Sequence, residues 1–177
     1  GRIEVICGSM FSGKTEELIN RVKKSNKSYK VFKPDIDTRN ETDKIKSHSK
    51  IEIDATTINN INEILNYKDK FDVIGIDEAQ FFSNDIVSVS NSLANNGVRV
   101  IIAGLDMDFS GKPFGPMPFL MAIAEDVTKV HAECVETGDP ALYSFRKVDN
   151  DETVMIGEKK EYQPLSRKAF ISKSKKS

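Results

Sequence analysis

The chain has 177 residues, of which 38% are hydrophobic and 30% are charged. This composition suits one globular domain with a small appendage, and it excludes a disordered or fibrous chain. Lysine and arginine number 26 against 27 aspartate and glutamate residues, a formal net charge of −1. Because proteins that bind nucleic acid or an anionic membrane surface usually carry a basic excess, we expect no nucleic-acid partner and no membrane partner.

The compartment is indicated by the cysteines and by the amino end. Cys7 and Cys134 are the two cysteines, too few for a disulfide framework, which favours a reducing compartment. No apolar run approaches the length of a membrane span, and the amino end lacks the charged and then apolar layout of a signal peptide. We therefore expect a cytoplasmic protein.

Short runs rich in β-branched residues alternate along the chain with segments of helical periodicity. These patterns predict strands at 3–7, 29–32, 71–76 and 98–103, and helices at 14–24, 58–67 and 85–95. The strand runs are apolar almost throughout, as expected for strands buried on both faces. Strand and helix in alternation predict an α/β fold, in which a parallel sheet carries helices on both faces.

Three segments fall outside this alternation. The polar segment 34–50 has no periodicity, and we interpret it as a long loop or a lid. After Val130 short pieces are separated by turn signals, which indicates a small β-rich subdomain at 131–170. The main α/β domain is then 1–130, and the lysine- and serine-rich tail at 171–177 is expected to be disordered.

The segment 8–15 reads GSMFSGKT and matches the phosphate-binding pattern GxxxxGK[ST] between a predicted strand and a predicted helix. In such a loop, backbone N–H groups and the helix N-terminus point at the phosphates, the lysine reaches the β and γ oxygens, and the hydroxyl can bind magnesium. Lys14 is therefore also a candidate catalytic residue. The predicted ATP-binding residues are Gly8, Ser9, Met10, Phe11, Ser12, Gly13, Lys14 and Thr15.

Two adjacent acids, Asp77 and Glu78, end the third predicted strand. Ligands of parallel α/β sheets collect at the carboxyl ends of the strands, so these acids should emerge beside the phosphate loop. Asp77 then suits magnesium, directly or through water, together with Thr15, and Glu78 suits a general base for an attacking hydroxyl or water. These motifs leave the acceptor open between a kinase, an ATPase motor and a switch protein.

Two aromatic-bearing stretches bear on the acceptor. They read DEAQFF at 77–82 and GLDMDFSGKPFG at 104–115. The second begins at the carboxyl end of the fourth predicted strand, in the same crevice as the acids. Leu105, Phe109 and Phe114 could form an apolar slot for a flat base, although loop aromatics more often pack on their own domain.

With these motifs the chain resembles the type II, cellular-type thymidine kinases. The resemblance covers 2–170 and includes the phosphate loop, DTR at 37–39, DEAQFF, GLD with KPFG at 112–115, and VMIG at 154–157 followed by Tyr162. It implies a RecA-like domain and a small subdomain whose lasso loop, here about 152–166, covers the nucleoside. It also implies transfer of the γ-phosphoryl group of ATP to the 5′-hydroxyl of thymidine, which gives thymidine monophosphate for deoxynucleoside salvage.

The resemblance implies roles for single residues. Glu78 would take the proton of the 5′-hydroxyl, Arg39 would stabilise charge in the transition state, and Asp37 would lie near the metal and the phosphates. It also implies a homotetramer that is inhibited by the end product, thymidine triphosphate. The implied nucleoside-binding residues are Met10, Phe81, Leu105, Phe109, Phe114, Val154, Met155, Ile156, Gly157 and Tyr162.

One feature departs from the family, whose members usually hold a structural zinc ion with two CxxC pairs. The corresponding positions here are Cys134, Thr137, Ser166 and Ala169, so one thiol remains of four. Because a tetrahedral zinc site needs four good donors, we expect structural zinc to be absent.

Two other functions share some of these motifs. A DNA-stimulated ATPase of the RecA-like class would have the same phosphate loop and strand-end acids, but the near-zero net charge and the lack of a basic and aromatic stripe disfavour it. A non-catalytic nucleotide sensor derived from the kinase would fit the lost thiols. Retention of Lys14, Thr15, Asp77 and Glu78 disfavours the sensor.

Overall fold

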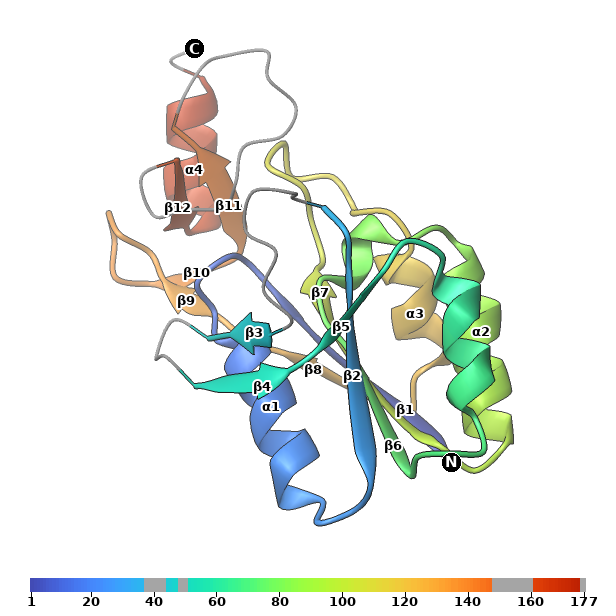
Figure 1. The fold of residues 1–177 in the computed structure, drawn as a ribbon. Helices are drawn as coiled ribbons and strands as arrows, with labels where there is room; N and C mark the ends of the chain where they lie inside the picture. The colour runs from blue at the N-terminus through green and yellow to red at the C-terminus, as the bar shows by residue number, and fades with distance from the viewer. Residues whose placement is uncertain (37–43, 48–50, 148–160, 176–177) are drawn as a thin grey trace.

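A parallel β-sheet forms the centre of the protein in the computed structural model, which describes residues 1–36, 44–47, 51–147 and 161–175. Among these residues, the main sheet has the strand order β5-β2-β6-β7-β1-β8, and every neighbouring pair is parallel (Figure 1). The predicted α/β fold with a parallel sheet is confirmed. The strands are β1 (Arg2–Gly8), β2 (Tyr29–Pro34), β5 (Thr56–Ile58), β6 (Val73–Ile76), β7 (Arg99–Leu105) and β8 (Asp126–Lys129).

Helices cover both faces of this sheet, as the sequence predicts. They are α1 (Lys14–Lys24), the 3₁₀ helix η1 (Ile61–Tyr67), α2 (Asp85–Asn95) and α3 (Met117–Ile123). Figure 1 shows α1 on one face and α2 with α3 on the other. Because side chains alternate along a strand, β1 sends Val5 and Cys7 into the core under α2, and Ile6 into the core under α1. Cys7 is therefore a buried core residue.

The predicted helices at 14–24 and 85–95 are confirmed, and the one at 58–67 is wrong in its first residues and in its type. Ile58 pairs with Pro34 as the last residue of β5, because its apolar side chain fits the sheet core better than a helix start. The side chain of Asn60 then caps η1 by accepting a hydrogen bond from the Asn62 N–H group, at 3.0 Å.

Several short elements were not predicted. Helix α3 has seven residues, too few for a clear helical period, and β8 at the sheet edge is polar and half-exposed. An antiparallel pair, β3 (Lys44–Lys46) and β4 (Glu52–Asp54), lies beside α1, and β3 falls within the predicted lid at 34–50. Among the described residues no helix has the length and apolar character that a membrane span requires.

Residues 132–147 and 161–175 form a small β-rich unit beyond the carboxyl edge of the main sheet (Figure 1). It has its own apolar cluster, in which the Tyr143 and Phe170 rings stack at 4.1 Å. Its elements form two antiparallel pairs and one helix: β9 (Ala132–Glu133) with β10 (Pro140–Ala141), β11 (Tyr143–Arg146) with β12 (Tyr162–Leu165), and α4 (Arg167–Ser174).

Helix α4 continues through Ser174, so the predicted disorder of the tail at 171–177 is wrong for residues 171–174. Two interactions explain the order. Ser166 caps the helix by accepting a hydrogen bond from the Ala169 N–H group, and Lys173 forms an ion pair with Glu136 at 2.8 Å. A lysine- and serine-rich composition gave no sign of either contact.

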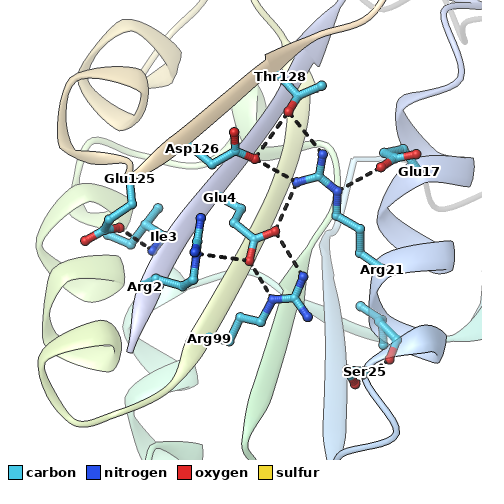
Figure 2. Close-up of polar contacts among 11 residues, drawn as sticks. Arg2, Ile3, Glu4, Glu17, Arg21, Ser25, Arg99, Glu125, Asp126 and Thr128 are labelled. Atoms are coloured by element: carbon cyan, nitrogen blue, oxygen red, sulfur yellow. Dashed lines mark hydrogen bonds and ion pairs between the residues drawn. The ribbon is translucent and has the colours of Figure 1, made fainter.

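A buried carboxylate, Glu4, lies on the α1 face of β1 and is 4% exposed. Figure 2 shows three arginines around it: Arg99 from β7, Arg21 from α1 and Arg2. Arg21 extends the network to Asp126 and Thr128 of β8, each at 3.1 Å. Burial raises the pKa of Glu4, but the hydrogen bond and charge of Arg99 and the charges of Arg21 and Arg2 hold it below its usual value.

We expect Glu4→Gln to lower the free energy of unfolding by about 2–4 kcal/mol at pH 7, because it leaves the arginines around a neutral group. A carboxylate with a lowered pKa stabilises the fold fully above its unfolded-state pKa, here 4.5, and this contribution is lost as the pH falls through the folded-state pKa. The difference in the free energy of unfolding between Glu4→Gln and wild type should therefore shrink below pH 4.5. Urea unfolding at pH 7 and pH 4 measures both effects.

Glu17→Gln is the matched control, because Glu17 is a more exposed i,i+4 partner of the same Arg21. We expect it to cost at most about 0.5 kcal/mol. Equal losses for the two variants would contradict a special role for the buried carboxylate.

Candidate active site

The predicted phosphate-binding residues form one loop between β1 and α1 at the carboxyl edge of the sheet. Lys14 is the first residue of α1, and its ammonium group folds back over the loop. It donates hydrogen bonds to the Ser9 carbonyl at 2.6 Å and to the Ser12 hydroxyl at 3.4 Å. Burial lowers the pKa of Lys14, and the charges of nearby carboxylates, Glu78 first, oppose that effect. The loop is thus arranged around a buried cation, as an anion site requires.

Asp77 directly follows β6 and contacts the start of α1. Its two carboxylate oxygens lie 3.1 and 3.4 Å from the Thr15 hydroxyl, which donates to them. Burial and the charge of Glu78 raise the pKa of Asp77 to about 7, although the Glu78 N–H group, the Thr15 hydroxyl and Lys14 oppose the rise. A hydroxyl and a carboxylate beside a phosphate loop are the hard oxygen donors that magnesium takes with a nucleotide, so these residues fit that metal.

Glu78 has a left-handed backbone conformation, with φ 52°. Such a conformation costs a residue with a side chain about 1 kcal/mol or more. Among the described residues the other non-glycine residues with positive φ are Phe11, in the phosphate loop, and Asn26. Two of the three strained positions therefore lie at the predicted site. At Glu78 the strained turn starts η2 (Ala79–Phe81) immediately after Asp77.

Aromatic residues also follow β6 and β7, the strands whose ends carry the acids. The Phe81 and Phe114 rings pack edge to face with centroids 5.5 Å apart, and Phe81 is 46% exposed. The guanidinium group of Arg146 lies over the Phe109 ring at 4.1 Å, and Arg146 is paired across β11 and β12 with Tyr162. Burial raises the pKa of Tyr162, and the charge of Arg146 opposes the rise. Exposed aromatic rings of this kind can bind a flat base.

Some predicted site residues lie outside the part of the chain that the structure describes. Asp37 and Arg39 lie outside the described residues, and so do the predicted lasso residues Val154, Met155, Ile156 and Gly157. Leu105 is the last residue of β7, half-buried, with its N–H group bonded to the side chain of Gln80. The described part of the site therefore holds the phosphate loop, the acids and the aromatic residues.

The structure adds residues that the sequence did not assign. Asp106 follows β7, is buried, and forms an ion pair with Lys129 of β8 at 2.8 Å. The Ser144 hydroxyl of β11 accepts a hydrogen bond from the Met10 N–H group at 2.9 Å, and so links the small β-rich unit to the phosphate loop. Asp106 could have been found from its place at a strand end, whereas no local pattern connects Ser144 with Met10.

The four positions that correspond to the family's zinc ligands meet in the small β-rich unit. The Thr137 hydroxyl donates to the Ser166 hydroxyl at 3.3 Å, and the Ala169 methyl is buried beside Cys134 in the local apolar cluster. Burial raises the pKa of Cys134, but hydrogen bonds from Thr137, Ser166 and the Glu136 backbone lower it to about 6. One thiol, two hydroxyls and a methyl group do not fit zinc. Among the described residues no group of three or more His, Cys, Asp or Glu side chains could hold a metal ion.

A strand, a phosphate loop and a helix, with an acid at the end of β6, which β7 separates from β1, define a P-loop nucleotide-binding α/β protein. The sequence profile described as thymidine kinase matches residues 1–170. The chain belongs to the thymidine kinase family.

Relatives support the same assignment. The thymidine kinase of Bacteroides thetaiotaomicron is 55% identical over 174 residues, which cover 97% of this chain and 87% of that protein. The thymidine kinase of Porphyromonas gingivalis is 54% identical over 173 residues, covering 96% of this chain and 85% of that protein, and that of a Rhodothermus species is 47% identical over 173 residues, covering 96% and 81%. The predicted family is confirmed, and the ATPase and sensor alternatives are not favoured.

We expect Asp77→Asn to raise the melting temperature of the ligand-free protein by about 2–5 °C at pH 8. The amide keeps the shape of the side chain and can still accept from Thr15, but it removes a buried negative charge beside Glu78. Thermal unfolding without nucleotide or metal tests this, with the exposed Asp54→Asn as the control. An unchanged or lower melting temperature for Asp77→Asn would show that the buried charge is not a source of instability.

Proposed function

We propose that this protein is an ATP-dependent thymidine kinase that makes thymidine monophosphate. The observation that supports the proposal most is the meeting of Lys14, the Thr15–Asp77 pair and Glu78 at one edge of the sheet, in a chain of the thymidine kinase family. Phosphoryl transfer needs positioning and neutralisation of charge more than covalent help from protein groups, and this site supplies both.

In the proposed reaction the loop N–H groups and Lys14 hold the phosphates of ATP. Thr15 and Asp77, together with Asp37, would hold magnesium, directly or through water, and this ion would neutralise phosphate charge. Glu78 takes the proton of the thymidine 5′-hydroxyl while the oxygen of that hydroxyl bonds to the γ-phosphorus. The bond from the γ-phosphorus to the β,γ-bridging oxygen breaks, ADP leaves, and Arg39 stabilises the charge on the transferring group.

The nucleoside pocket belongs to the same proposal. Phe81, Phe109 and Phe114, with Met10 and Leu105, would enclose the base and the sugar, and Tyr162 would close the pocket. Segment 34–50 would act as a lid over the phosphates. Segment 152–166 would act as the lasso, with Val154, Met155, Ile156 and Gly157 at the edge of the thymine ring.

The remaining family properties are proposals of the same kind. We propose a cytoplasmic homotetramer, divided into a nucleotide-binding domain at 1–130 and a small subdomain at 131–170, whose end product thymidine triphosphate inhibits it. An assay of thymidine phosphorylation with ATP and magnesium, with and without single-stranded DNA, tests the activity. Formation of thymidine monophosphate without DNA supports the proposal, and ATP hydrolysis that requires DNA contradicts it.

We expect Glu78→Gln to reduce turnover by about 10²- to 10⁴-fold, the usual loss for a general base, because the amide cannot accept the hydroxyl proton. Binding of ATP and thymidine should stay close to that of wild type. Steady-state kinetics and nucleotide titration measure these effects, and the exposed Glu63→Gln on η1 is the control. Near-normal turnover would remove Glu78 from this role.

We also propose that the protein holds no structural zinc. Elemental analysis of the purified protein should give less than about 0.1 zinc per chain, and a strong chelator should leave the melting temperature unchanged. The triple variant Thr137→Cys, Ser166→Cys, Ala169→Cys is the positive control, because it restores four thiols and should bind about one zinc ion. Wild-type protein with one zinc per chain, and with a melting temperature that falls on chelation, would contradict the proposal.

A further inference from the structure

Gln80 is a buried polar residue to which the sequence motifs assign no role. It lies in η2, two residues after Glu78, and is 3% exposed. A buried side-chain amide costs free energy unless its donor and acceptor are both hydrogen-bonded. Both ends of this amide are bonded. Its oxygen accepts from the Leu105 N–H group at 3.0 Å, and its nitrogen donates to Oε2 of Glu78 at 2.9 Å.

The orientation of the Gln80 amide follows from its partners. A backbone N–H group can only donate, so the amide oxygen must face Leu105. The amide nitrogen then faces Glu78, where a carboxylate can only accept. Because Leu105 ends β7, the bond ties Gln80 to a rigid strand of the central sheet. Gln80 is therefore a bridge between β7 and the Glu78 carboxylate.

The surroundings of Gln80 are shaped for this bridge. A Cβ atom at Gly104 would lie 2.9 Å from the amide oxygen of Gln80 and 2.7 Å from the Met117 sulfur. A Cβ atom at Gly115, where φ is 49°, would lie 2.7 Å from the Gln80 carbonyl oxygen. These positions accept only glycine without movement of Gln80 or its neighbours. Gly104 thus packs closely against the side-chain amide of Gln80, and Gly115 packs closely against its backbone.

We propose that Gln80 is a positioning residue that holds the Glu78 carboxylate toward the acceptor hydroxyl. The inference rests on the proposed kinase function, in which Glu78 is the general base. The left-handed backbone of Glu78 sets where its side chain starts, and the bond from Gln80 fixes one of its carboxylate oxygens. The other oxygen is then directed away from Gln80, to receive the hydroxyl proton. A general base must be within hydrogen-bond reach of that proton, so a free rotation of the carboxylate would lower the rate.

Two variants separate the two ends of the bridge. Gln80→Glu is nearly isosteric and keeps an oxygen for Leu105, but it replaces the amide donor that faces Glu78. Gln80→Met removes both hydrogen bonds at a similar volume. We expect each variant to lower kcat by about 10- to 100-fold, with the KM values for ATP and thymidine within about 3-fold of wild type. Asn91→Asp is the control, because it makes the same amide-to-carboxylate change at an exposed position of α2, and it should leave kcat unchanged.

The decisive measurement is a double-mutant cycle with Glu78→Gln. If Gln80 acts through Glu78, adding either Gln80 variant to Glu78→Gln should change kcat by less than about 2-fold. The same loss in both backgrounds would overturn the inference, because it would show an effect independent of Glu78. A loss with Gln80→Met but not with Gln80→Glu would also overturn it, since the bond to Leu105 alone would then matter.

Other outcomes separate this inference from the proposed function. A raised KM for thymidine with unchanged kcat would overturn the positioning role and would indicate contact between Gln80 and the nucleoside. If Glu78→Gln lowers turnover and the Gln80 variants do not, the kinase function stands and the inference fails. If wild-type protein forms no thymidine monophosphate, both fail. If Gln80→Met does not fold, Gln80→Glu still completes the cycle, and ATP binding reports whether its phosphate loop is intact.

Discussion

The structure depends on a balance of charges at one end of the central sheet. Asp77, Glu78 and Asp106 follow two neighbouring strands there, and Lys14 and Lys129 are the cations that oppose them. Burial raises the pKa of Asp77 and lowers the pKa of Lys14, so neither charge is well accommodated without a ligand. A triphosphate with its metal ion would supply the charges that this arrangement lacks. The strand order is what brings the groups together, since β6, β7, β1 and β8 are neighbours in the sheet.

Backbone strain is concentrated at the same place. Phe11 and Glu78 have left-handed conformations within the loops that carry the proposed catalytic groups. Such strain persists only where the surrounding structure holds it, and at Glu78 the Gln80 bridge to β7 contributes to this. A site of this kind is organised before the substrate arrives, which lowers the reorganisation needed during the reaction.

The sequence predicted those parts of the fold that rest on local patterns. The apolar strands, α1 and α2 were predicted correctly because burial on both faces and helical periodicity leave clear signals. The sequence also indicated the phosphate loop, which a fixed residue spacing defines, and the acids, which stand at the end of a strand.

Predictions failed where tertiary contacts decide the structure. Ile58 joined the sheet because Pro34 of β2 lies beside it, and α4 extends into the predicted tail because Ser166 caps it and Lys173 pairs with Glu136. Gln80 gave no signal for its role, because its partner Leu105 is 25 residues away.

The bond between the Met10 N–H group and Ser144 has a consequence for the order of folding. The two residues are 134 positions apart, so the phosphate loop is completed by a strand near the far end of the chain. Contacts of such long sequence separation form late, because a large loop must close first. During synthesis β1 and α1 emerge early, but the Met10 N–H group between them gains its Ser144 partner only after β11 is made. A chain that stops before β11 therefore lacks a contact between the small β-rich unit and its phosphate loop.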